Sequence, residues 1–366
     1  MKVAYYAPLP PARTGVADYA AALLAALRRH GSVEPGARHA DIALYHLGNN
    51  QLHREIYRRA LAEPGVVVLH DAVLHHFLLG SLDRAAYVDE FVYNYGEWNR
   101  PFGERMWRER GNSGFDRRYF DYPMLKRIAE RSRAVVVHNP AAARMVREHA
   151  ASAVVVEIPH LFAPPRLPAG WEVARMRQSL EVPHSAFLFG IFGYLRESKR
   201  VLGILRAFAA LRRARPYAYL LVAGAFVSSD LERAVAPMLH GPGIVRLPYL
   251  AERDFWSAAL AVDACTNLRY PAAGETSGIA VRLMGVGKPV LLTNSAENAR
   301  YPEASCLRVE PGVAEEDSLW HHMILLTSIQ ESAGEIGLRA SAHIAERHQA
   351  ARIAEMYWEM LCAFRP

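Results

Sequence analysis

The loop Gly274-Glu275-Thr276-Ser277-Gly278 carries the clearest chemical pattern in the sequence. It leaves a predicted strand through a proline turn and opens an apolar helix. Small residues at a helix start let backbone N–H groups approach an anion closely, and the helix dipole favours negative charge there. Thr276, Ser277 and Gly278 are therefore candidate phosphate-binding residues, with Glu275 placed to hydrogen-bond hydroxyl groups. For the loop taken alone, an ordinary capped helix is the alternative interpretation.

Polar side chains also follow two predicted strands in the first half of the chain. His70-Asp71 follow one apolar run, and His138-Asn139 follow another. Open parallel sheets bind ligands beyond the carboxyl ends of their strands, so all four side chains are expected at the rim of a binding site. We favour a functional role for His70, and Asp71, His138 and Asn139 are candidates for the same rim. A purely structural role stays open for His138 and Asn139.

The elements that must position these residues are short apolar runs alternating with amphipathic stretches, a pattern typical of parallel α/β sheets. The predicted strands of the first half are Val3–Ala7, Ile42–Tyr45, Val66–Leu69, Ala134–Val137 and Val154–Ile158. Those of the second half are Phe187–Phe192, Tyr219–Val222, Ile244–Leu247, Val262–Asn267, Val290–Leu292 and Leu307–Val309. Helices separate them, for example one predicted over Val201–Ala214.

These elements divide into two successive α/β domains with a cleft expected between them. We predict an N-terminal domain over 1–162 with extra helices at about 82–133, a proline-rich linker over 163–185, a second domain over 186–341 and a terminal helix over 342–366. The aromatic rings of 82–133 are interpreted as core residues rather than a sugar-stacking surface. A basic patch there is interpreted as a solvated face, with attraction to anionic lipid headgroups as the alternative: Arg117, Arg118, Lys126, Arg127, Arg131 and Arg133.

Composition agrees with a folded two-domain protein. Of the 366 residues, 51% are apolar and 22% charged, which excludes a mostly disordered chain. The 43 Lys and Arg residues are interspersed with 37 Asp and Glu residues, unlike the concentrated charge of a nucleic-acid binder. The three cysteines lack disulfide or zinc spacing, and no run approaches the roughly 18 apolar residues of a membrane span. We expect a cytoplasmic protein without a signal peptide, free or peripheral to the inner face of the membrane.

A family resemblance emerges from the second half of the chain. The segment Asn267–Val290, with its loop Gly274–Gly278 and its closing Gly287-Lys288-Pro289-Val290, resembles the donor-site motif of the glycosyltransferase family 4 (group 1) enzymes. Phe192–Lys199 is similar to the family's Gly-Arg-Leu-x-x-x-Lys segment, whose basic side chains hold the donor diphosphate, and Lys199 falls on its lysine.

The resemblance extends over nearly the whole chain. Pro10–Tyr19, which contains Gly15, is similar to the family's glycine-containing loop after the first strand. Tyr45–Asn50 and Val68–His76 resemble segments of one branch of the family. The spacing of His70, His75 and His76 fits no standard zinc pattern.

Several positions depart from the family pattern. Arg282 occupies the position of a glutamate that normally binds the nucleotide ribose, and the position of the other glutamate falls on Gly274, one residue before Glu275. Tyr194 replaces the arginine of Gly-Arg-Leu, and Arg196 is expected to supply that charge.

Lysine is rare, and its placement supports the same segments. Only four of the basic residues are lysines, and Lys199 and Lys288 both lie inside the motifs. A compact ammonium there suits a phosphate, whereas a solvated turn is the alternative for Lys288.

The resemblance implies the GT-B fold, in which two Rossmann-like domains with parallel sheets face each other across a cleft. It further implies that the terminal helix crosses back to the first domain and that the cleft closes on the donor. The implied activity is that of a retaining transferase moving a hexosyl unit from a nucleotide-diphosphate sugar to a hydroxyl of a glycan, lipid-linked or small-molecule acceptor. Cell-surface polysaccharide or glycoconjugate synthesis is the implied setting.

In this scheme His70, Glu275 and Lys199 are catalytic, and protein cations stabilise the departing diphosphate, so no metal or other cofactor is expected. The donor-binding residues are then Gly15, Arg196, Lys199, Glu275, Thr276, Ser277, Gly278 and Arg282. Asp71, His138 and Asn139 are the candidates on the acceptor side.

Two alternatives stay open. A GT-B nucleotide-sugar epimerase needs carboxylate acid/base groups on both sides of the cleft, and no convincing pair is found near His70. A catalytically inert sugar-nucleotide-binding subunit is favoured by Arg282 and Tyr194.

Overall fold

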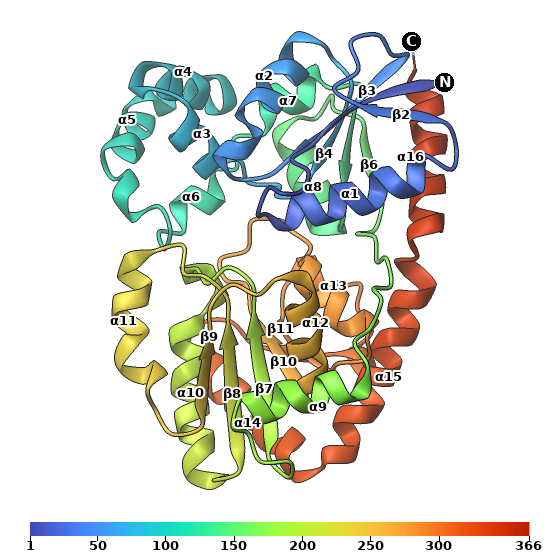
Figure 1. Ribbon diagram of the computed structural model, residues 1–366. Coiled ribbons are helices and arrows are strands. Elements are labelled where there is room, and N and C mark those ends of the chain that lie inside the picture. The colour runs from blue at the N-terminus through green and yellow to red at the C-terminus, as the bar shows by residue number, and fades with distance from the viewer. Residues whose placement is uncertain (366) are drawn as a thin grey trace. The chain divides into compact units, whose positions relative to one another are not determined.

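The structure is a computed structural model that describes residues 1–365 and divides into two compact units. Unit 1 contains Met1–Ala163, the segment Pro271–Gly278 and the chain from His348 onward. Unit 2 contains Pro164–Tyr270 and Ile279–Arg347. Figure 1 shows the elements of both units. Among residues 1–365, no helix combines the length and the apolar character needed to cross a membrane.

Unit 1 is built on a parallel sheet of six strands in the order β2-β1-β3-β4-β5-β6. Its strands are β1 Lys2–Tyr6, β2 Ser32–Pro35, β3 Ile42–Leu47, β4 Val66–Leu69, β5 Ala134–Val137 and β6 Val155–Glu157. Successive side chains of a strand point to opposite faces. In β4, Val66 and Val68 therefore pack with α1 and α16, whereas Val67 and Leu69 join the core under the other helices.

The helices of unit 1 cover both faces of this sheet. They are α1 Gly15–Leu27, η1 Gln51–His53, α2 Arg54–Ala62, α3 His75–Ser81, α4 Arg84–Tyr95, η2 Glu97–Asn99, α5 Arg100–Arg108, η3 Arg110–Asn112, α6 Arg118–Asp121, α7 Lys126–Arg131, α8 Pro140–His149 and α16 Ala350–Phe364. Helix α16, red in Figure 1, packs on α1, where the Tyr357 hydroxyl lies 3.0 Å from that of Tyr19.

Unit 2 holds a second parallel sheet of six strands, in the order β12-β11-β10-β7-β8-β9. The strands are β7 Phe187–Phe192, β8 Ala218–Ala223, β9 Ile244–Leu247, β10 Ala264–Asn267, β11 Val290–Thr293 and β12 Leu307–Val309. The helices are α9 Gly170–Ser179, η4 Glu197–Lys199, α10 Val201–Ala214, α11 Ser229–Leu239, α12 Glu252–Ala261, α13 Gly278–Gly285, η5 Ala296–Asn298, η6 Glu303–Ser305, α14 Glu315–Ser328 and α15 Gln330–Arg347.

Each predicted strand corresponds to a strand of the structure, and the predicted helix Val201–Ala214 is α10. The strand β2 was not predicted. It has four residues, lies at the sheet edge and buries only Val33, so its sequence Ser-Val-Glu-Pro lacks an apolar pattern.

Three boundaries differ from the predicted ones. The predicted linker 163–185 contains α9, which packs on α12. The segment Pro271–Gly278 belongs to unit 1, although we placed it inside the second domain. The predicted terminal helix 342–366 consists of the end of α15 and then α16, separated by residues 348–349, and residue 366 lies outside the described residues.

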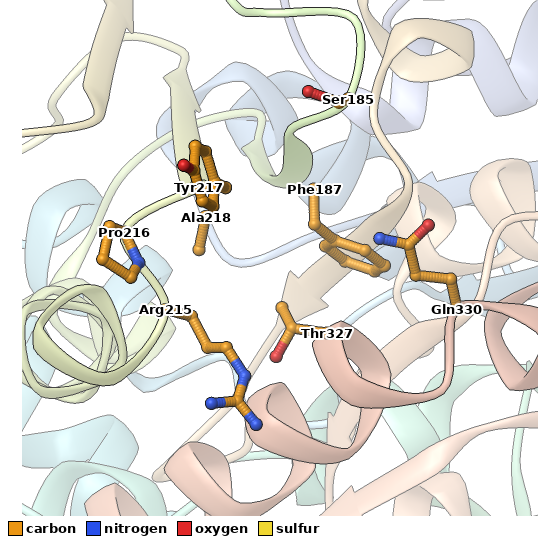
Figure 2. A pocket seen from close by; sticks show the side chains of 8 residues that line it. All are labelled: Ser185, Phe187, Arg215, Pro216, Tyr217, Ala218, Thr327 and Gln330. Carbon is orange, nitrogen blue, oxygen red and sulfur yellow. The ribbon is translucent and has the colours of Figure 1, made fainter.

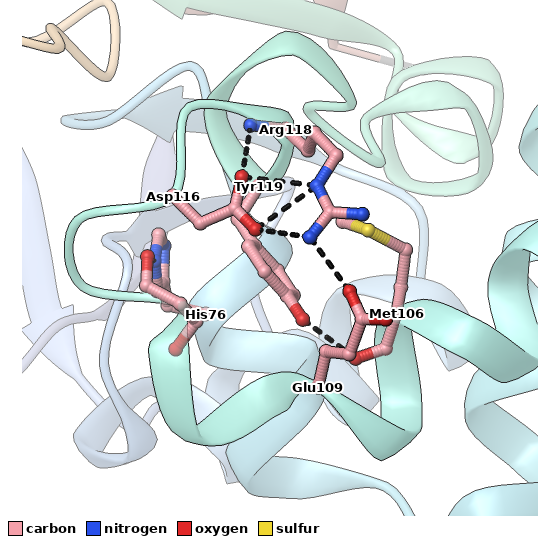
Figure 3. A network of polar contacts seen from close by, with 7 residues as sticks. His76, Met106, Glu109, Asp116, Arg118 and Tyr119 are labelled. Carbon is pink, nitrogen blue, oxygen red and sulfur yellow. Dashed lines mark hydrogen bonds and ion pairs between the residues drawn. The ribbon is translucent and has the colours of Figure 1, made fainter.

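The helices between residues 82 and 133 contain their own packed interior. Tyr87, Phe91 and Tyr119 are fully buried, whereas Trp98 is 97% exposed. Figure 3 shows Arg118 between the carboxylates of Asp116 and Glu109, and the Tyr119 hydroxyl donating to the Met106 carbonyl at 2.6 Å.

Half of the predicted basic patch is paired with carboxylates. Besides Arg118, Arg117 pairs with Asp121 and Arg127 pairs with Glu90. These pairs lower the net positive charge that the patch presents to an anionic surface.

Truncating one buried and one exposed aromatic side chain tests which rings of this region belong to the core. We expect Phe91→Ala to lower the free energy of unfolding by about 3–5 kcal/mol, because it leaves a cavity. Trp98→Ala is expected to change it by less than about 0.5 kcal/mol. Urea unfolding followed by circular dichroism measures both, and equal midpoints for the two variants would contradict this assignment.

Candidate functional site

Four neighbouring strands of unit 1 bring histidines to their carboxyl ends. His46 lies near the end of β3, His70 follows β4, His138 follows β5, and His160 lies beyond the end of β6. All four are at most 8% exposed. The ring of Tyr19 on α1 contacts all four imidazoles, with centroid distances from 4.7 to 6.0 Å.

Hydrogen bonds fix the orientation of these rings. His46 Nδ1 lies 3.0 Å from His70 Nε2. His138 Nδ1 donates to the Ile158 carbonyl at 2.9 Å, and His160 Nδ1 donates to the Leu161 carbonyl at 2.9 Å. Burial lowers the pKa of His46 and His70 well below the usual value, and nearby histidines lower it further. Burial lowers the pKa of His138 from 6.5 to about 4. His46, His70 and His138 are therefore neutral at pH 7.

The predicted loop Gly274–Gly278 packs on the same edge of unit 1, and Asn139 holds it there. The Asn139 side-chain amide donates to the Gly274 carbonyl and to the Thr276 hydroxyl, both at 3.0 Å. Its oxygen accepts from Ala142 N at 2.8 Å and so caps α8. Ala72 N also donates to the Ala273 carbonyl at 2.8 Å. Asn139 therefore joins the start of α8 to the loop, and Ala72 adds a third segment to the same contact region.

The loop has a backbone that requires glycine at one position. Gly274 has a φ of +70°, and a Cβ there would lie 2.6 Å from the Cβ of Ala72. The Glu275 carboxylate accepts from Ala273 N at 2.6 Å and so closes the turn. A Cβ on Gly278 would lie 3.2 Å from His160 Nε2. Ser277 is buried beside it.

The other predicted residues of unit 1 lie around this edge. The Asp71 carboxylate accepts from Asn49 N at 2.8 Å, which ties the loop after β3 to the loop after β4. Gly15 is the first residue of α1, whose cap is Thr14. A Cβ on Gly15 would have no atom within 4 Å among the described residues.

In unit 2, Lys199 is buried at the carboxyl end of β7. It is 5% exposed, and its Nζ donates to the Phe192 carbonyl. Within residues 1–365, no carboxylate lies within 4 Å of this ammonium group. Burial lowers the pKa of Lys199 well below its usual range, and the charges of Arg269 and Arg196 lower it further. Three basic side chains therefore meet where the strands end.

Two further cations of unit 2 contact protein groups instead. Arg282 donates to the Glu252 carboxylate at 2.6 Å and lies over the Phe255 and Trp256 rings, so it joins α13 to α12. A ribose contact of Arg282 stays a prediction. Lys288 donates to the carbonyls of Leu260 and Val262, at 2.8 and 2.7 Å. It is thus neither a solvated turn residue nor a residue of the carboxyl edge, because it precedes β11.

A pocket of about 350 Å³ lies at the amino-terminal ends of β7 and β8. Figure 2 shows its lining residues, with the side chains of Arg215, Tyr217 and Thr327 around Phe187. This is the edge of the sheet opposite to Lys199, so the pocket is separate from the predicted donor site. In the described part of the chain, no group of three or more His, Cys, Asp or Glu side chains is arranged to hold a metal ion.

The predicted site residues thus form two groups. Unit 1 brings together His70, His138, Asn139 and the loop 274–278, with Asp71 and Gly15 on the neighbouring loops. Unit 2 places Lys199 near Arg196, and holds Arg282 on another helix.

No protein-family model and no curated protein matches the sequence. Solved structures do match. HepE of Anabaena, crystallised with UDP and glucose, is 15% identical with a TM-score of 0.66, over 99% of this chain and 100% of that chain. The fold is GT-B. The two six-stranded sheets with their flanking helices are the two Rossmann-like domains of GT-B glycosyltransferases, which confirms the predicted fold class.

Two more structures agree on this GT-B fold. Sucrose-phosphate synthase from Thermosynechococcus elongatus is 14% identical with a TM-score of 0.64, over 99% of this chain and 96% of that chain. WaaG, described as a glycosyltransferase involved in lipopolysaccharide biosynthesis, is 13% identical with a TM-score of 0.64, over 98% of this chain and 99% of that chain.

Several residues of this GT-B site escaped the sequence interpretation. His46 and His160 complete the histidine cluster, and Arg269 joins Lys199. A signal was present, because a histidine lies at or shortly after the carboxyl end of each of four successive predicted strands. Arg269 likewise follows the predicted strand Val262–Asn267 by two residues.

The role of Asn139 can be tested by separating its two functions. Asn139→Asp keeps the oxygen that caps α8 but loses the amide that donates to the loop. We expect it to accelerate amide hydrogen exchange of residues 273–278, which Asn139 holds in place. Asn139→Ala should also lose about 1 kcal/mol of stability, because the cap is removed. Unchanged exchange in both variants would show that the loop is held by other contacts.

Acidification is expected to destabilise unit 1. The pKa of buried His138 is about 4, against 6.5 when it is exposed. As the pH falls from 6.5 towards 4, the unfolded chain binds a proton that the native ring does not. Each such histidine therefore lowers the free energy of unfolding by about 1.4 kcal/mol per pH unit. Urea unfolding at several pH values measures how the free energy of unfolding declines with pH. In His138→Asn this decline should be shallower by about 1.4 kcal/mol per pH unit.

Proposed function

We propose that this chain is a glycosyltransferase that transfers a hexosyl unit from a nucleotide-diphosphate sugar to a hydroxyl acceptor. The cation cluster at Lys199 is the observation that carries this proposal. A buried ammonium without a carboxylate partner is unfavourable unless a ligand supplies negative charge. A diphosphate would supply it, and would raise the pKa of Lys199 towards its usual range.

The chemistry follows from this charge distribution. Breaking the bond between the sugar and the phosphate leaves negative charge on the departing diphosphate. Fixed cations at Lys199, Arg196 and Arg269 stabilise that charge more in the transition state than in the substrate. Because protein cations perform this task, we propose a reaction that needs no metal ion.

The edge of unit 1 is proposed to bind the sugar and the acceptor. His70 and Glu275 are the proposed catalytic contacts, and Thr276, Ser277 and Gly278 offer backbone N–H groups at the start of α13. Asn139 is engaged with the loop, so we assign it to holding the loop rather than to direct acceptor contact.

The comparisons support the donor class, because HepE was crystallised with UDP and with UDP-glucose. Membership of family 4 and retention of the anomeric configuration are proposed from the sequence resemblance. A glycan or lipid-linked acceptor in cell-surface polysaccharide or glycoconjugate synthesis is proposed on the same ground. A cytoplasmic location is proposed from the number and spacing of the cysteines, and peripheral contact with the membrane from the basic patch within 117–133.

Turnover of candidate donors tests the proposal. Purified protein is incubated with a panel of nucleotide-diphosphate sugars and hydroxyl acceptors in the presence of a chelator, and released nucleoside diphosphate is measured. Lys199→Ala is expected to reduce kcat by about 100-fold or more, because a preorganised electrostatic contact to the leaving group is lost. The control Arg206→Ala removes an exposed cation on α10 that pairs with Glu316, and should retain activity.

Calorimetry with nucleoside diphosphates separates an enzyme from an inert binding subunit. Binding without turnover of any donor would favour the inert subunit. Absence of both binding and turnover would overturn the donor-site assignment.

A further inference from the structure

We propose that His46 is a positioning residue that keeps the proton of His70 on Nδ1, so that His70 presents an N–H donor to an oxygen of the substrate. The sequence analysis did not assign His46 to the site. The catalytic consequence rests on the proposed function, whereas the protonation pattern itself does not.

A hydrogen bond between His46 Nδ1 and His70 Nε2 requires that one of these two nitrogens carries a proton and the other does not. The two nitrogens lie 3.0 Å apart, and both rings are neutral because they are buried among other imidazoles. One ring must therefore donate and the other must accept. Whichever nitrogen donates decides where the proton of His70 lies, because a neutral imidazole carries one N–H.

The second nitrogen of His46 decides between these arrangements. Within residues 1–365, His46 Nε2 is buried and has no hydrogen-bond partner. If His70 donated, His46 would have to carry its proton on Nε2, which would leave a buried N–H without an acceptor. Orphaned N–H groups are rarer in proteins than acceptors with an unused lone pair. His46 Nδ1 is therefore the donor, His70 Nε2 is the acceptor, and the proton of His70 is on Nδ1.

The surrounding histidines follow the same pattern. His53, His138, His160 and His348 each donate from Nδ1 to a backbone carbonyl, which can only accept. In His53 and His138, whose pKa burial lowers to about 4, the Nε2 atom therefore carries a lone pair at neutral pH. His46 also donates from Nδ1, but its acceptor is the His70 side chain and not a backbone carbonyl. This hydrogen bond is what places the proton of His70 on Nδ1.

Among residues 1–365, the packing gives His46 no ionic partner that would change this result. The ring contacts Tyr5 of β1, Tyr19 of α1 and His70. His138 and His53 interact with it electrostatically. Burial raises the pKa of both Tyr5 and Tyr19, so neither is an anion at neutral pH. His70 is the member of the pair that retains exposure, at 8%, against none for His46.

This protonation pattern gives His70 a specific chemical role. A neutral imidazole with its proton on Nδ1 donates a hydrogen bond to a hydroxyl or phosphate oxygen. It cannot act as a general base through that nitrogen. His70 would thus recognise an oxygen acceptor on the sugar or the leaving group over the whole range above its lowered pKa.

The experiment reads the proton position directly. Long-range ¹H–¹⁵N correlation spectra of protein labelled at histidine distinguish a protonated Nδ1 from a protonated Nε2, and the His70 signals are identified by their loss in His70→Gln. Wild type is expected to show His70 protonated at Nδ1. A proton on Nε2 in wild type would overturn the proposal without any assay of activity.

Two His46 variants complete the test. His46→Phe keeps a ring in place but removes the donor to His70 Nε2. The proton of His70 is then no longer held on Nδ1, so the His70 ¹⁵N signals should leave their wild-type positions, with kcat reduced about tenfold, the effect of one lost hydrogen bond. His46→Asn places an amide nitrogen where Nδ1 lies and should restore the wild-type His70 signals. An unchanged His70 signal in His46→Phe would contradict the positioning role. Inactivity of the wild type with every donor, combined with the expected spectra, would refute the proposed function and leave the protonation pattern standing.

Discussion

The hydrogen bonds of Asn139 are the contact on which the organisation of unit 1 depends. One side chain caps α8 through its oxygen and holds Gly274 and Thr276 through its nitrogen. A stretch from the second half of the chain thereby becomes part of the first unit. The glycine at position 274 allows this approach, because a side chain there would overlap Ala72. The loop and the histidine cluster share an edge because this contact exists.

Both edges that we assign to ligands keep polar groups away from water. In unit 2 the buried group is a cation, Lys199, whose charge the described residues leave without a carboxylate in contact. In unit 1 the buried groups are imidazoles, which avoid the cost of burial by remaining neutral. A charged ligand is therefore expected to bind at the first of these edges, and a hydroxyl-bearing one at the second.

The sequence predicted the strands well because parallel strands are buried on both faces and appear as continuous apolar runs. It missed β2, whose exposed edge position needs no such run. The residues after the strands were partly predicted, and His70, His138 and Asn139 do lie together. The sequence did not predict that Asn139 binds the loop, because this hydrogen bond joins residues 135 positions apart. The contact of Arg282 with Glu252 could not be predicted either, because it depends on how α13 packs on α12.

The return of α16 to unit 1 has a consequence for biosynthesis. The core that contains β1, β3 and β4 also contains Tyr357 and Leu361, which follow all of unit 2 in the chain and therefore leave the ribosome after it. Unit 2, by contrast, is complete in sequence at Arg347. The first half of the chain must therefore wait with part of its apolar face uncovered while the second half is still being made. Domains usually fold in the order of synthesis, but here unit 1 begins before unit 2 and can be completed only after unit 2 has been synthesised.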